Sequence, residues 1–205
     1  MIRLKKNEPI KHNGIYYDLS SYDQAKLWRV YDDNPVLRYL FEIVADENEE
    51  EEIETYFSSL EYKLFAPVSN NILREKIYNK GKEKGYDFIS YVSRKCTNFV
   101  TSIGENCFIL EDNTLQPFTK IGNNVILWSG NHIGHHSVIE DNIFFTSHVV
   151  MSGHCHIKKG AFLGVNACIR DGVTIGENCI IGMGSVVTKD TEDNNTYIGS
   201  PARKK

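Results

Sequence analysis

An apolar residue returns at every sixth position through the second half of the chain, and this period constrains the fold more than any other feature. The fifteen positions are Ile103, Ile109, Leu115, Ile121, Leu127, Ile133, Ile139, Phe145, Met151, Ile157, Leu163, Ile169, Ile175, Ile181 and Val187. A period of six matches neither the alternation of a β-strand nor the 3.6-residue turn of an α-helix, so the repeating unit must be a short strand followed by a turn. The pattern predicts a parallel β-helix with three faces. Eighteen residues then form one coil, and the fifteen hexads form about five coils.

The chain changes character near residue 97, which predicts two domains and a tail. Residues 1–97 mix aromatic and charged residues and predict a small α/β domain, in which the acidic run 45–54 starts a solvated helix or loop. Residues 98–190 form the β-helix, so the fold is mainly β. Residues 191–205 are expected to cover the end of the β-helix, because an open strand edge must be covered.

Within the first domain, residues 62–68 predict a buried strand, and residues 72–80 space their apolar positions as a helix does. Asn70 is suited to cap that helix, because a side-chain oxygen at this position accepts a hydrogen bond from a backbone N–H of the first turn. The remaining boundaries are a helix stop at Gly81 or Gly85 and a further strand over residues 86–92.

Composition excludes several classes of function. The 205 residues carry a net charge of -4, and the only basic cluster is the short tail Arg203–Lys205, which argues against nucleic acid as a partner. No stretch is apolar enough for membrane insertion, and the N-terminus lacks the apolar core of a signal peptide, so we expect a cytoplasmic protein. The five cysteines include no CxxC pair and are expected to be reduced, mostly buried thiols.

Four segments of the chain resemble the hexapeptide-repeat acyltransferases, and more narrowly the bacterial nucleotide-amino-sugar N-acetyltransferases of the bacillosamine type and their sialic-acid O-acetyltransferase relatives. They are SNNILREKIYNKGKEKGYDFISYV, NVILWSGNHIGHHSVIEDN, FLGVNACIRDGVTIGENCIIGMGSVVTKD and GSPARK. The resemblance implies a left-handed β-helix, a homotrimer, acetyl-CoA bound between neighbouring β-helices, and a nucleotide sugar held by the first domain. Residues 1–61 do not share it.

Six of the seven histidines lie between residues 132 and 156. His135 and His136 fall at a turn and should point outward, and His154, eighteen residues after His136, should stack on it one coil away. The resemblance implies that His135 is the catalytic base, with His136 as the second candidate and a structural role as the alternative.

Acyl transfer needs a group that takes a proton from the attacking amine or hydroxyl, and the ordinary histidine pKa of about 6.5 suits this role at neutral pH. The resemblance implies that the Gly153 N–H holds the oxyanion of the tetrahedral intermediate, and a glycine there would also admit the thioester. The relatives carry acidic residues beside their histidine, whereas this chain has Gly134 and His136. An orienting carboxylate would have to come from elsewhere, with Glu111 and Asp112 as candidates.

Histidine clusters on a β-helix also raise the possibility of zinc, as in the gamma-type carbonic anhydrases. That pattern needs two histidines five residues apart and a third about two coils away, and no pair here is five or 36 apart. We therefore expect no metal. A novel site made of His136, His154 and a neighbour's histidine stays open as an alternative, and with it a zinc-dependent lyase on the same fold.

Other residues are candidates for binding. His148, Asn166, Arg203 and Lys204 are expected to join Gly153 in binding coenzyme A, the last two at its 3′-phosphate. Asn131, Trp128 and Asn70 are candidates for substrate binding. For the turn residues the alternative is simple solvation, and for Arg203 and Lys204 it is a frayed tail.

Together these features predict an acyltransferase that moves an acetyl or small acyl group from acyl-CoA to the amine of a nucleotide-linked amino sugar in surface-polysaccharide biosynthesis. A sugar O-acetyltransferase is the nearest alternative in mechanism. A non-catalytic β-helix used for assembly is the alternative from another class.

Overall fold

The computed structural model describes residues 2–5, 10–12, 15–17, 59 and 62–205, so the acidic run 45–54 lies outside the described part. The chain divides into two compact units. One contains Met1–Ala66 with Ile77–Ile89, and the other contains Pro67–Lys76 with Ser90–Lys205. No helix in the described residues is long and apolar enough to cross a membrane.

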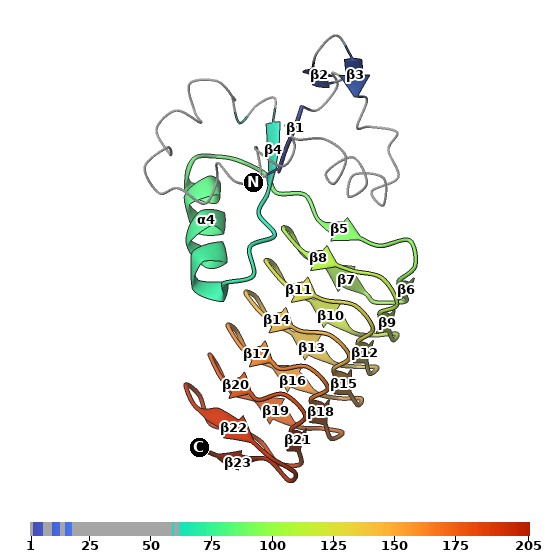
Figure 1. Ribbon diagram of the computed structural model, residues 1–205, viewed down its shortest axis with the longest axis vertical. Helices are drawn as coiled ribbons and strands as arrows, with labels where there is room; N and C mark the ends of the chain where they lie inside the picture. The colour runs from blue at the N-terminus through green and yellow to red at the C-terminus, as the bar shows by residue number, and fades with distance from the viewer. Residues whose placement is uncertain (1, 6–9, 13–14, 18–58, 60–61) are drawn as a thin grey trace. The chain divides into compact units, whose positions relative to one another are not determined.

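The second unit is a parallel β-helix with three faces (Figure 1). The first face contains β5 (Tyr91–Val92), β8 (Phe108–Ile109), β11 (Ile126–Leu127), β14 (Phe144–Phe145), β17 (Phe162–Leu163), β20 (Ile180–Ile181), β22 (Thr196–Ile198) and β23 (Arg203–Lys204). The second face contains β6 (Thr97–Asn98), β9 (Thr114–Leu115), β12 (His132–Ile133), β15 (Val150–Met151), β18 (Cys168–Ile169) and β21 (Val186–Val187). The third face contains β7 (Ser102–Ile103), β10 (Lys120–Ile121), β13 (Val138–Ile139), β16 (His156–Ile157) and β19 (Thr174–Ile175).

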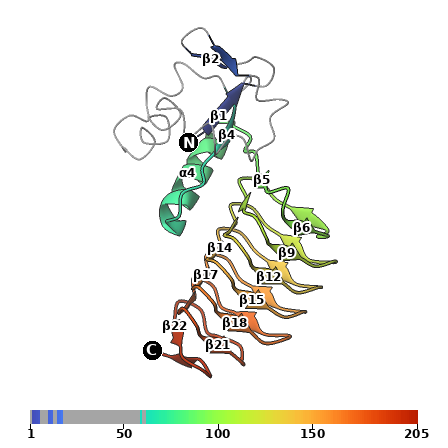
Figure 2. The same cartoon turned by 45° about the vertical axis from the view of Figure 1, so that its right-hand side comes forward.

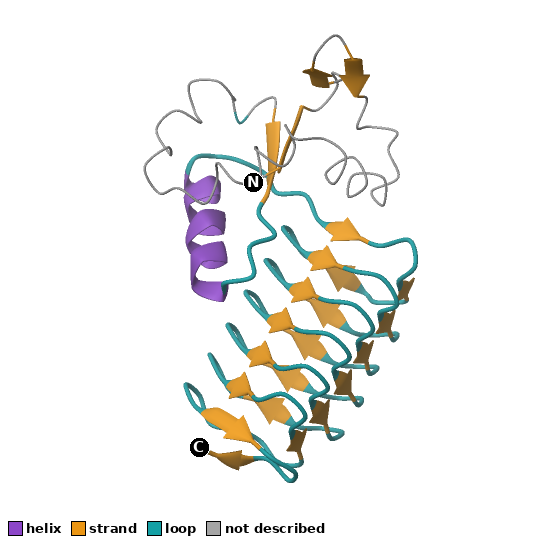
Figure 3. Cartoon of the chain, viewed as in Figure 1, coloured by secondary structure: helices purple, strands orange, loops and turns teal. Residues whose placement is uncertain are grey.

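The interior of the β-helix follows the predicted hexads. The second residue of each central strand points inward, and fourteen of the fifteen predicted positions are buried, with Ile103 half-buried at the first coil. Residues eighteen apart pair on adjacent coils, as His132 does with Val150. Figure 2 shows the coils stacked edge to edge, and Figure 3 shows the short strands separated by turns at the three corners.

The β-helix has about six turns, one more than the sequence predicts. The extra length comes from coils that break the strict period. Val92 pairs with Ile109, an offset of seventeen residues, and Thr196 pairs with Ile180, an offset of sixteen. A search with a fixed step of six therefore stops at both ends before the ladder does. The tail continues the first face through β22, and β23 folds back antiparallel to it.

The first unit contains β1 (Ile2–Lys5), which pairs antiparallel with β4 (Tyr62–Phe65), and a hairpin of β2 (Ile10–His12) and β3 (Ile15–Tyr17). The predicted strand over residues 62–68 is confirmed in its first half. The predicted strand over residues 86–92 is wrong as a single element, because Phe88 makes only an isolated bridge to Leu64 and Tyr91–Val92 already belongs to the β-helix as β5.

Helix α4 (Asn71–Glu83) begins one residue before the predicted helix and ends three residues after it. The Leu73 N–H donates to Asn70 Oδ1 at 3.0 Å, which makes Asn70 the N-cap. Gly85, at φ +79°, ends the helix, with hydrogen bonds from its own N–H to Lys82 and from Tyr86 to Gly81. Gly81, the other predicted stop, lies inside the helix, and a larger residue would not fit there because its Cβ would sit 2.5 Å from the Phe88 ring.

The first turn of α4 is fastened to the β-helix within the second unit. Arg74 is fully buried, and its guanidinium donates to the carbonyl oxygens of Asn124 and Ile143 at 3.1 and 3.2 Å. Burial lowers the pKa of Arg74 to about 10. Asn71 donates to the Gly160 carbonyl, and Lys159 lies 2.7 Å from the Glu75 carboxylate. This attachment was not predicted, because it joins residues fifty or more positions apart.

Candidate active site

The turns between the faces stack into three corners, each built from pairs of residues eighteen positions apart. The tryptophan corner joins the first face to the second and contains residues 111–112, 129–130, 147–148 and 165–166. The histidine corner joins the second face to the third and contains residues 117–118, 135–136, 153–154 and 171–172. The asparagine corner joins the third face to the first and contains residues 105–106, 123–124, 141–142 and 159–160.

The second residue of every pair has a positive φ, between 52° and 76°. This left-handed conformation favours glycine and is tolerated by asparagine, aspartate and histidine more readily than by other residues. Asparagine or glycine occupies most of these positions, but the histidine corner has Phe118, His136 and His154 in succession. The backbone alone does not require aromatic rings there.

Three imidazoles meet at the histidine corner. The rings of His136 and His154 are stacked, with centroids 4.9 Å apart and an interplanar angle of 14°. The His135 ring stands edge-on to both, at centroid distances of 5.2 and 5.1 Å. All three side chains are exposed, so the predicted stacking and outward direction are confirmed. Phe118 continues the column, with its centroid 4.7 Å from that of His136.

His135 Nδ1 lies 3.0 Å from His136 Nδ1, within hydrogen-bonding distance. A neutral imidazole carries a proton on one nitrogen and a lone pair on the other, so one of these two atoms donates and the other accepts. When His135 is the donor, its lone pair is on Nε2. The partner that the sequence could not identify for His135 is thus a second histidine rather than a carboxylate.

Gly153 lies directly beside the His135 ring. A Cβ at Gly153 would be 2.7 Å from His135 Cε1 and 2.9 Å from Nε2, closer than side chains pack, so only glycine leaves room for the ring in this position. Gly153 is buried.

The Gly153 N–H makes no hydrogen bond to any other residue that the structure describes. The equivalent N–H groups of five other turns donate to a side-chain oxygen, in Glu105, Asn123, His135, Lys159 and Glu177. An amide at this register can therefore donate to an oxygen outside the ladder. A buried donor without a partner needs an explanation, and an oxygen supplied by a ligand is one.

Gln116 is a site residue that sequence reasoning missed. Its Oε1 accepts a hydrogen bond from the His135 N–H at 3.0 Å, which fixes the backbone of the turn that carries the histidine. Phe118 is a second site residue that was missed. The offset of eighteen residues from Phe118 to His136 and then to His154 was available in the sequence, and it would have placed all three in one column.

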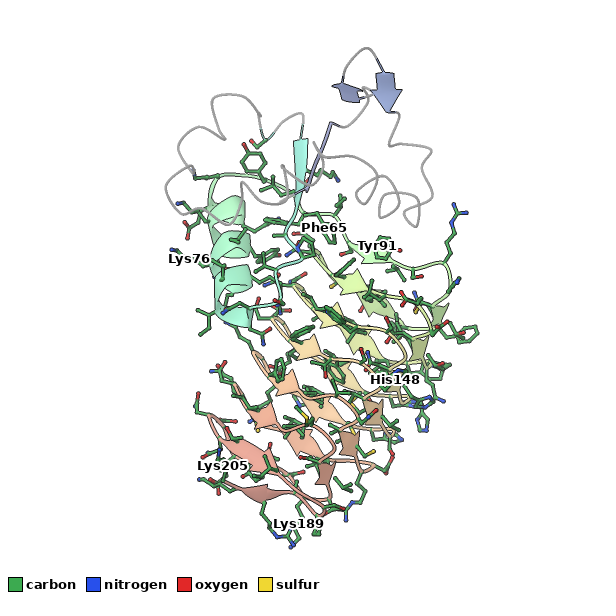
Figure 4. All side chains as sticks on the ribbon, viewed as in Figure 1. Phe65, Lys76, Tyr91, His148, Lys189 and Lys205 are labelled. Atoms are coloured by element: carbon green, nitrogen blue, oxygen red, sulfur yellow. The ribbon has the colours of Figure 1, made fainter. Side chains whose placement is uncertain are left out.

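Four predicted binding residues lie at the tryptophan corner or beside it, one face away from the histidines. His148 and Asn166 are exposed turn residues, and Figure 4 labels His148 on the outer side of the middle coils. Trp128 is 43% exposed and makes an edge contact with Phe144 at 6.2 Å between centroids. Asn131 is buried, and its side chain donates to the Trp128 carbonyl and accepts from the Val149 N–H. Its polar groups are used inside the corner, so we leave it out of the site.

The two suggested orienting carboxylates are also at the tryptophan corner. Glu111 accepts a hydrogen bond from the Ser129 hydroxyl at 2.6 Å, which lowers the pKa of Glu111. Asp112 is the exposed turn residue beside it. A strand of the second face separates both from His135 of the same chain, so neither orients it within one chain.

The remaining predicted residues are exposed. Asn70 caps α4, which occupies its side-chain oxygen. Arg203 and Lys204 form β23, and Lys204 Nζ lies 2.6 Å from the Glu192 carboxylate, which raises the pKa of Lys204. His136, also exposed, contacts His135 and His154 in the histidine corner.

Comparisons with known proteins support the resemblance predicted from the repeats. Residues 101–135 and 154–189 match the family model of the bacterial transferase hexapeptide (six repeats). Curated relatives include an acyl-(acyl-carrier-protein)-UDP-N-acetylglucosamine O-acyltransferase of Pseudomonas paraeruginosa, 32% identical over 41% of this chain and 33% of the relative. A protein of the same name from Campylobacter concisus is 28% identical over 55% of this chain and 47% of the relative. The chain thus spans less than half the length of these two relatives.

Solved structures extend the likeness beyond the repeats. A histidine-to-asparagine mutant of perosamine N-acetyltransferase from Caulobacter crescentus, in complex with CoA and GDP-perosamine, has a TM-score of 0.71 at 25% identity, covering 78% of this chain and 75% of that one. WeeI from Acinetobacter baumannii has a TM-score of 0.64 at 28% identity, covering 67% of this chain and 68% of that one. This chain therefore carries the hexapeptide repeat and the β-helix of these transferases.

Proposed function

We propose that this chain is a hexapeptide-repeat acyltransferase that moves an acetyl or other small acyl group from acyl-CoA to the amine of a nucleotide-linked amino sugar. The observation that carries the proposal is the pairing at the histidine corner of an exposed histidine with a buried, unpartnered N–H beside it. The neighbours bound to CoA and GDP-perosamine support the choice of donor and acceptor.

His135 is the general base in this proposal. Its Nδ1 is held by His136 at 3.0 Å, which orients the ring and leaves the Nε2 lone pair for the incoming amine. The amine nitrogen attacks the thioester carbonyl carbon, and His135 Nε2 takes the proton that the nitrogen loses. General acid–base catalysis of this kind contributes about 10²- to 10⁴-fold to the rate.

Gly153 supplies the oxyanion donor. As the carbonyl carbon becomes tetrahedral, its oxygen gains negative charge, and a fixed backbone N–H stabilises that charge without reorganising. The C–S bond then breaks, and the coenzyme A thiolate leaves and takes the proton from the His135 imidazolium. The base is thereby regenerated, and no further group is consumed.

His136 is a positioning residue rather than a second base. In this proposal its Nδ1 accepts the hydrogen bond from His135 Nδ1–H. Its ring stacks on His154 and also contacts the Phe118 ring, so it has little freedom to turn. In this proposal a neutral imidazole takes the place of the orienting carboxylate that the resemblance implies. The partner is therefore a weaker acceptor than an ionised acid.

The remaining residues of the proposed site lie away from the histidine corner within one chain. We propose that the protein is a homotrimer in which the tryptophan corner of one chain faces the histidine corner of the next, which would bring His148 and Asn166 to the coenzyme A. Arg203 and Lys204 would then neutralise its 3′-phosphate, and the first domain would hold the nucleotide.

A sugar O-acyltransferase is the second candidate, and the names of the curated relatives favour it. In those relatives the donor in the name is an acyl carrier protein and the acceptor is UDP-N-acetylglucosamine. The same histidine and N–H serve equally for a hydroxyl acceptor, so the acceptor must be tested directly.

The test is release of free thiol from acetyl-CoA by the full chain, with nucleotide-linked 3- and 4-amino sugars beside their hydroxyl counterparts. A parallel arm offers acyl carrier protein thioesters with UDP-N-acetylglucosamine. We expect turnover with an amino sugar and a loss of about 10²- to 10⁴-fold in kcat for His135→Ala. His148→Ala, an exposed turn histidine of the tryptophan corner, tests whether that corner contributes to the binding of acyl-CoA through KM.

Turnover confined to the hydroxyl sugars or to the carrier-protein arm would replace the N-acyl proposal with the O-acyl one. An unchanged kcat in His135→Ala would remove the assignment of the base while leaving the activity in place.

A further inference from the structure

The histidine corner has the composition of a transition-metal site. His135, His136 and His154 each offer a ring nitrogen, and these three atoms all lie within 4.8 Å of one another. Three histidines with an open fourth position are the ligand set of several zinc sites. The set contains no carboxylate, which disfavours magnesium and calcium and favours zinc or copper.

The spacing of the nitrogens requires only small movements. With zinc–nitrogen distances of about 2.0–2.1 Å, two ligands of a tetrahedral site lie roughly 3.3 Å apart. The Nδ1 atoms of His135 and His136 are already 3.0 Å apart. His154 must approach by up to about 1.5 Å, and because its side chain is exposed, rotation of the ring can supply this.

The arrangement is also partly rigid before any ligand arrives. The backbone N–H groups of both turns are held: that of His135 donates to Gln116 Oε1, and that of His154 donates to the His135 carbonyl. Phe118 and the stacking of the two rings limit the side-chain rotation of His136. A site whose ligands are held in place loses less freedom on binding than a site on flexible chains.

We infer that His135, His136 and His154 bind one divalent transition metal, Zn²⁺ or Cu²⁺, on each chain, and that bound metal reversibly blocks acyl transfer. The block rests on the proposed function, because the metal takes the imidazole that would accept the proton. Binding itself does not rest on it. A histidine can donate its lone pair to the metal or to a proton but not to both at once, so the two uses of His135 exclude each other.

The contact between the two Nδ1 atoms also sets a requirement for binding. That contact holds one proton between two nitrogens, and a metal can bind both Nδ1 atoms only when each imidazole carries its proton on Nε2. Zinc binding therefore changes the tautomer of one of the two histidines, and nitrogen-15 NMR of the imidazole rings detects this change.

The binding test uses the full chain without a polyhistidine tag, titrated with ZnCl₂ and, in parallel, with MgCl₂. We expect one zinc per chain, no magnesium, and zinc affinity at least tenfold weaker in His136→Ala and in His154→Ala. His148→Ala and His156→Ala are the matched controls, because each removes a histidine outside the cluster. Unchanged affinity in the two cluster variants, or equal losses in the controls, overturns the site.

The inhibition test uses the same proteins in the thiol-release assay. Zinc should slow the native enzyme, and a chelator should restore it. In His154→Ala, where the proposed base is intact, zinc at the same concentration should have at least tenfold less effect. Zinc bound at the cluster without slowing turnover overturns the block and with it the assignment of His135 as base. If no acceptor supports turnover, the proposed function fails, and the binding arm alone decides the metal site.

Discussion

The asparagine corner and the histidine corner share one backbone and differ in what they do with it. At Asn124 and Asn142 φ is 59° and 60°, and at His136 and His154 it is 56° and 57°. The asparagines are buried and bond to one another along the stack, with Asn106 Nδ2 donating to Asn124 Oδ1 at 2.6 Å and Asn124 donating in turn to Asn142. The histidines are exposed and contact chiefly each other.

The difference separates the residues that maintain the fold from those that are free for chemistry. The turn needs a residue that tolerates a positive φ, and asparagine meets this need while its side chain satisfies its neighbours. A column of exposed rings forms no hydrogen bond with a buried group. Any other residue that tolerates a positive φ would therefore stabilise the β-helix about as well. Side chains without a structural task at a repeated position are the ones to examine for function.

The largest effect on stability is expected at Asn124. Asn124→Ala removes two buried hydrogen bonds, one from the Asn106 amide and one to the Asn142 side-chain oxygen, and places alanine at positive φ. The expected loss in free energy of unfolding is about 3–5 kcal/mol. His154→Ala makes the matching change at the other corner, where only the backbone term of about 1 kcal/mol applies. Urea unfolding of both variants measures the difference, and equal losses would break the comparison.

Gly153→Ala should lower activity while leaving stability nearly unchanged, the reverse of the emphasis on stability at Asn124. The new methyl group would lie within 3 Å of the His135 ring, which is exposed and must move aside. We expect kcat to fall at least tenfold, because a displaced base of this kind loses much of its catalytic contribution. Thermal unfolding should be nearly unchanged.

The control is Gly172→Ala, one coil further along the same corner. Its Cβ meets nothing within 4 Å, but its φ of +71° is strained for alanine. It should lose about 1 kcal/mol of stability and keep its kcat. If Gly153→Ala kept full activity, neither the ring position nor the Gly153 N–H could be assigned as proposed.

His136→Asn transfers the residue of one corner to the other. Asparagine tolerates the positive φ, so the free energy of unfolding should change by less than about 0.5 kcal/mol. The loss of the Nδ1 partner of His135 should lower kcat several-fold to tenfold with little change in KM, since a positioning residue acts on the transition state. His136→Glu, which returns an acidic acceptor to this position, should recover more of the activity than His136→Asn. Equal activity in the two variants would show that His136 does not orient the base.

The regular part of the fold was predictable because each hexad repeats one physical requirement, an inward apolar residue eighteen positions below the next. The coils at both ends were missed because their offsets are seventeen and sixteen residues. The attachment of Arg74 to Asn124 and Ile143 was also missed, since no local pattern relates a helix residue to carbonyls of distant coils.

For the candidate site, the stacking of His136 on His154 followed from the same offset of eighteen and is confirmed. The contact between His135 and His136 was not predictable, because it depends on side-chain rotation within one turn. The uncapped Gly153 N–H was named from resemblance alone. Its distinguishing feature appears only in the structure, where Gly153 is buried beside the His135 ring.

The reactivity of the five thiols compares the inside and the outside of the β-helix without any mutation, and so with the smallest perturbation. Burial raises the pKa of Cys107 to about 11 and also raises that of Cys155 and Cys179, whereas Cys168 is exposed on the second face. Cys96 is half-buried, and burial raises its pKa to about 11 as well. At pH 8 a thiol of pKa about 11 is roughly 0.1% thiolate, and thiolate is the reactive form. One thiol per native chain should therefore react rapidly with a disulfide reagent, and all five should react after denaturation. Rapid reaction of two or more thiols in the native protein would mean that the interior of the coils opens, and protection of Cys168 would mean that another chain covers the second face.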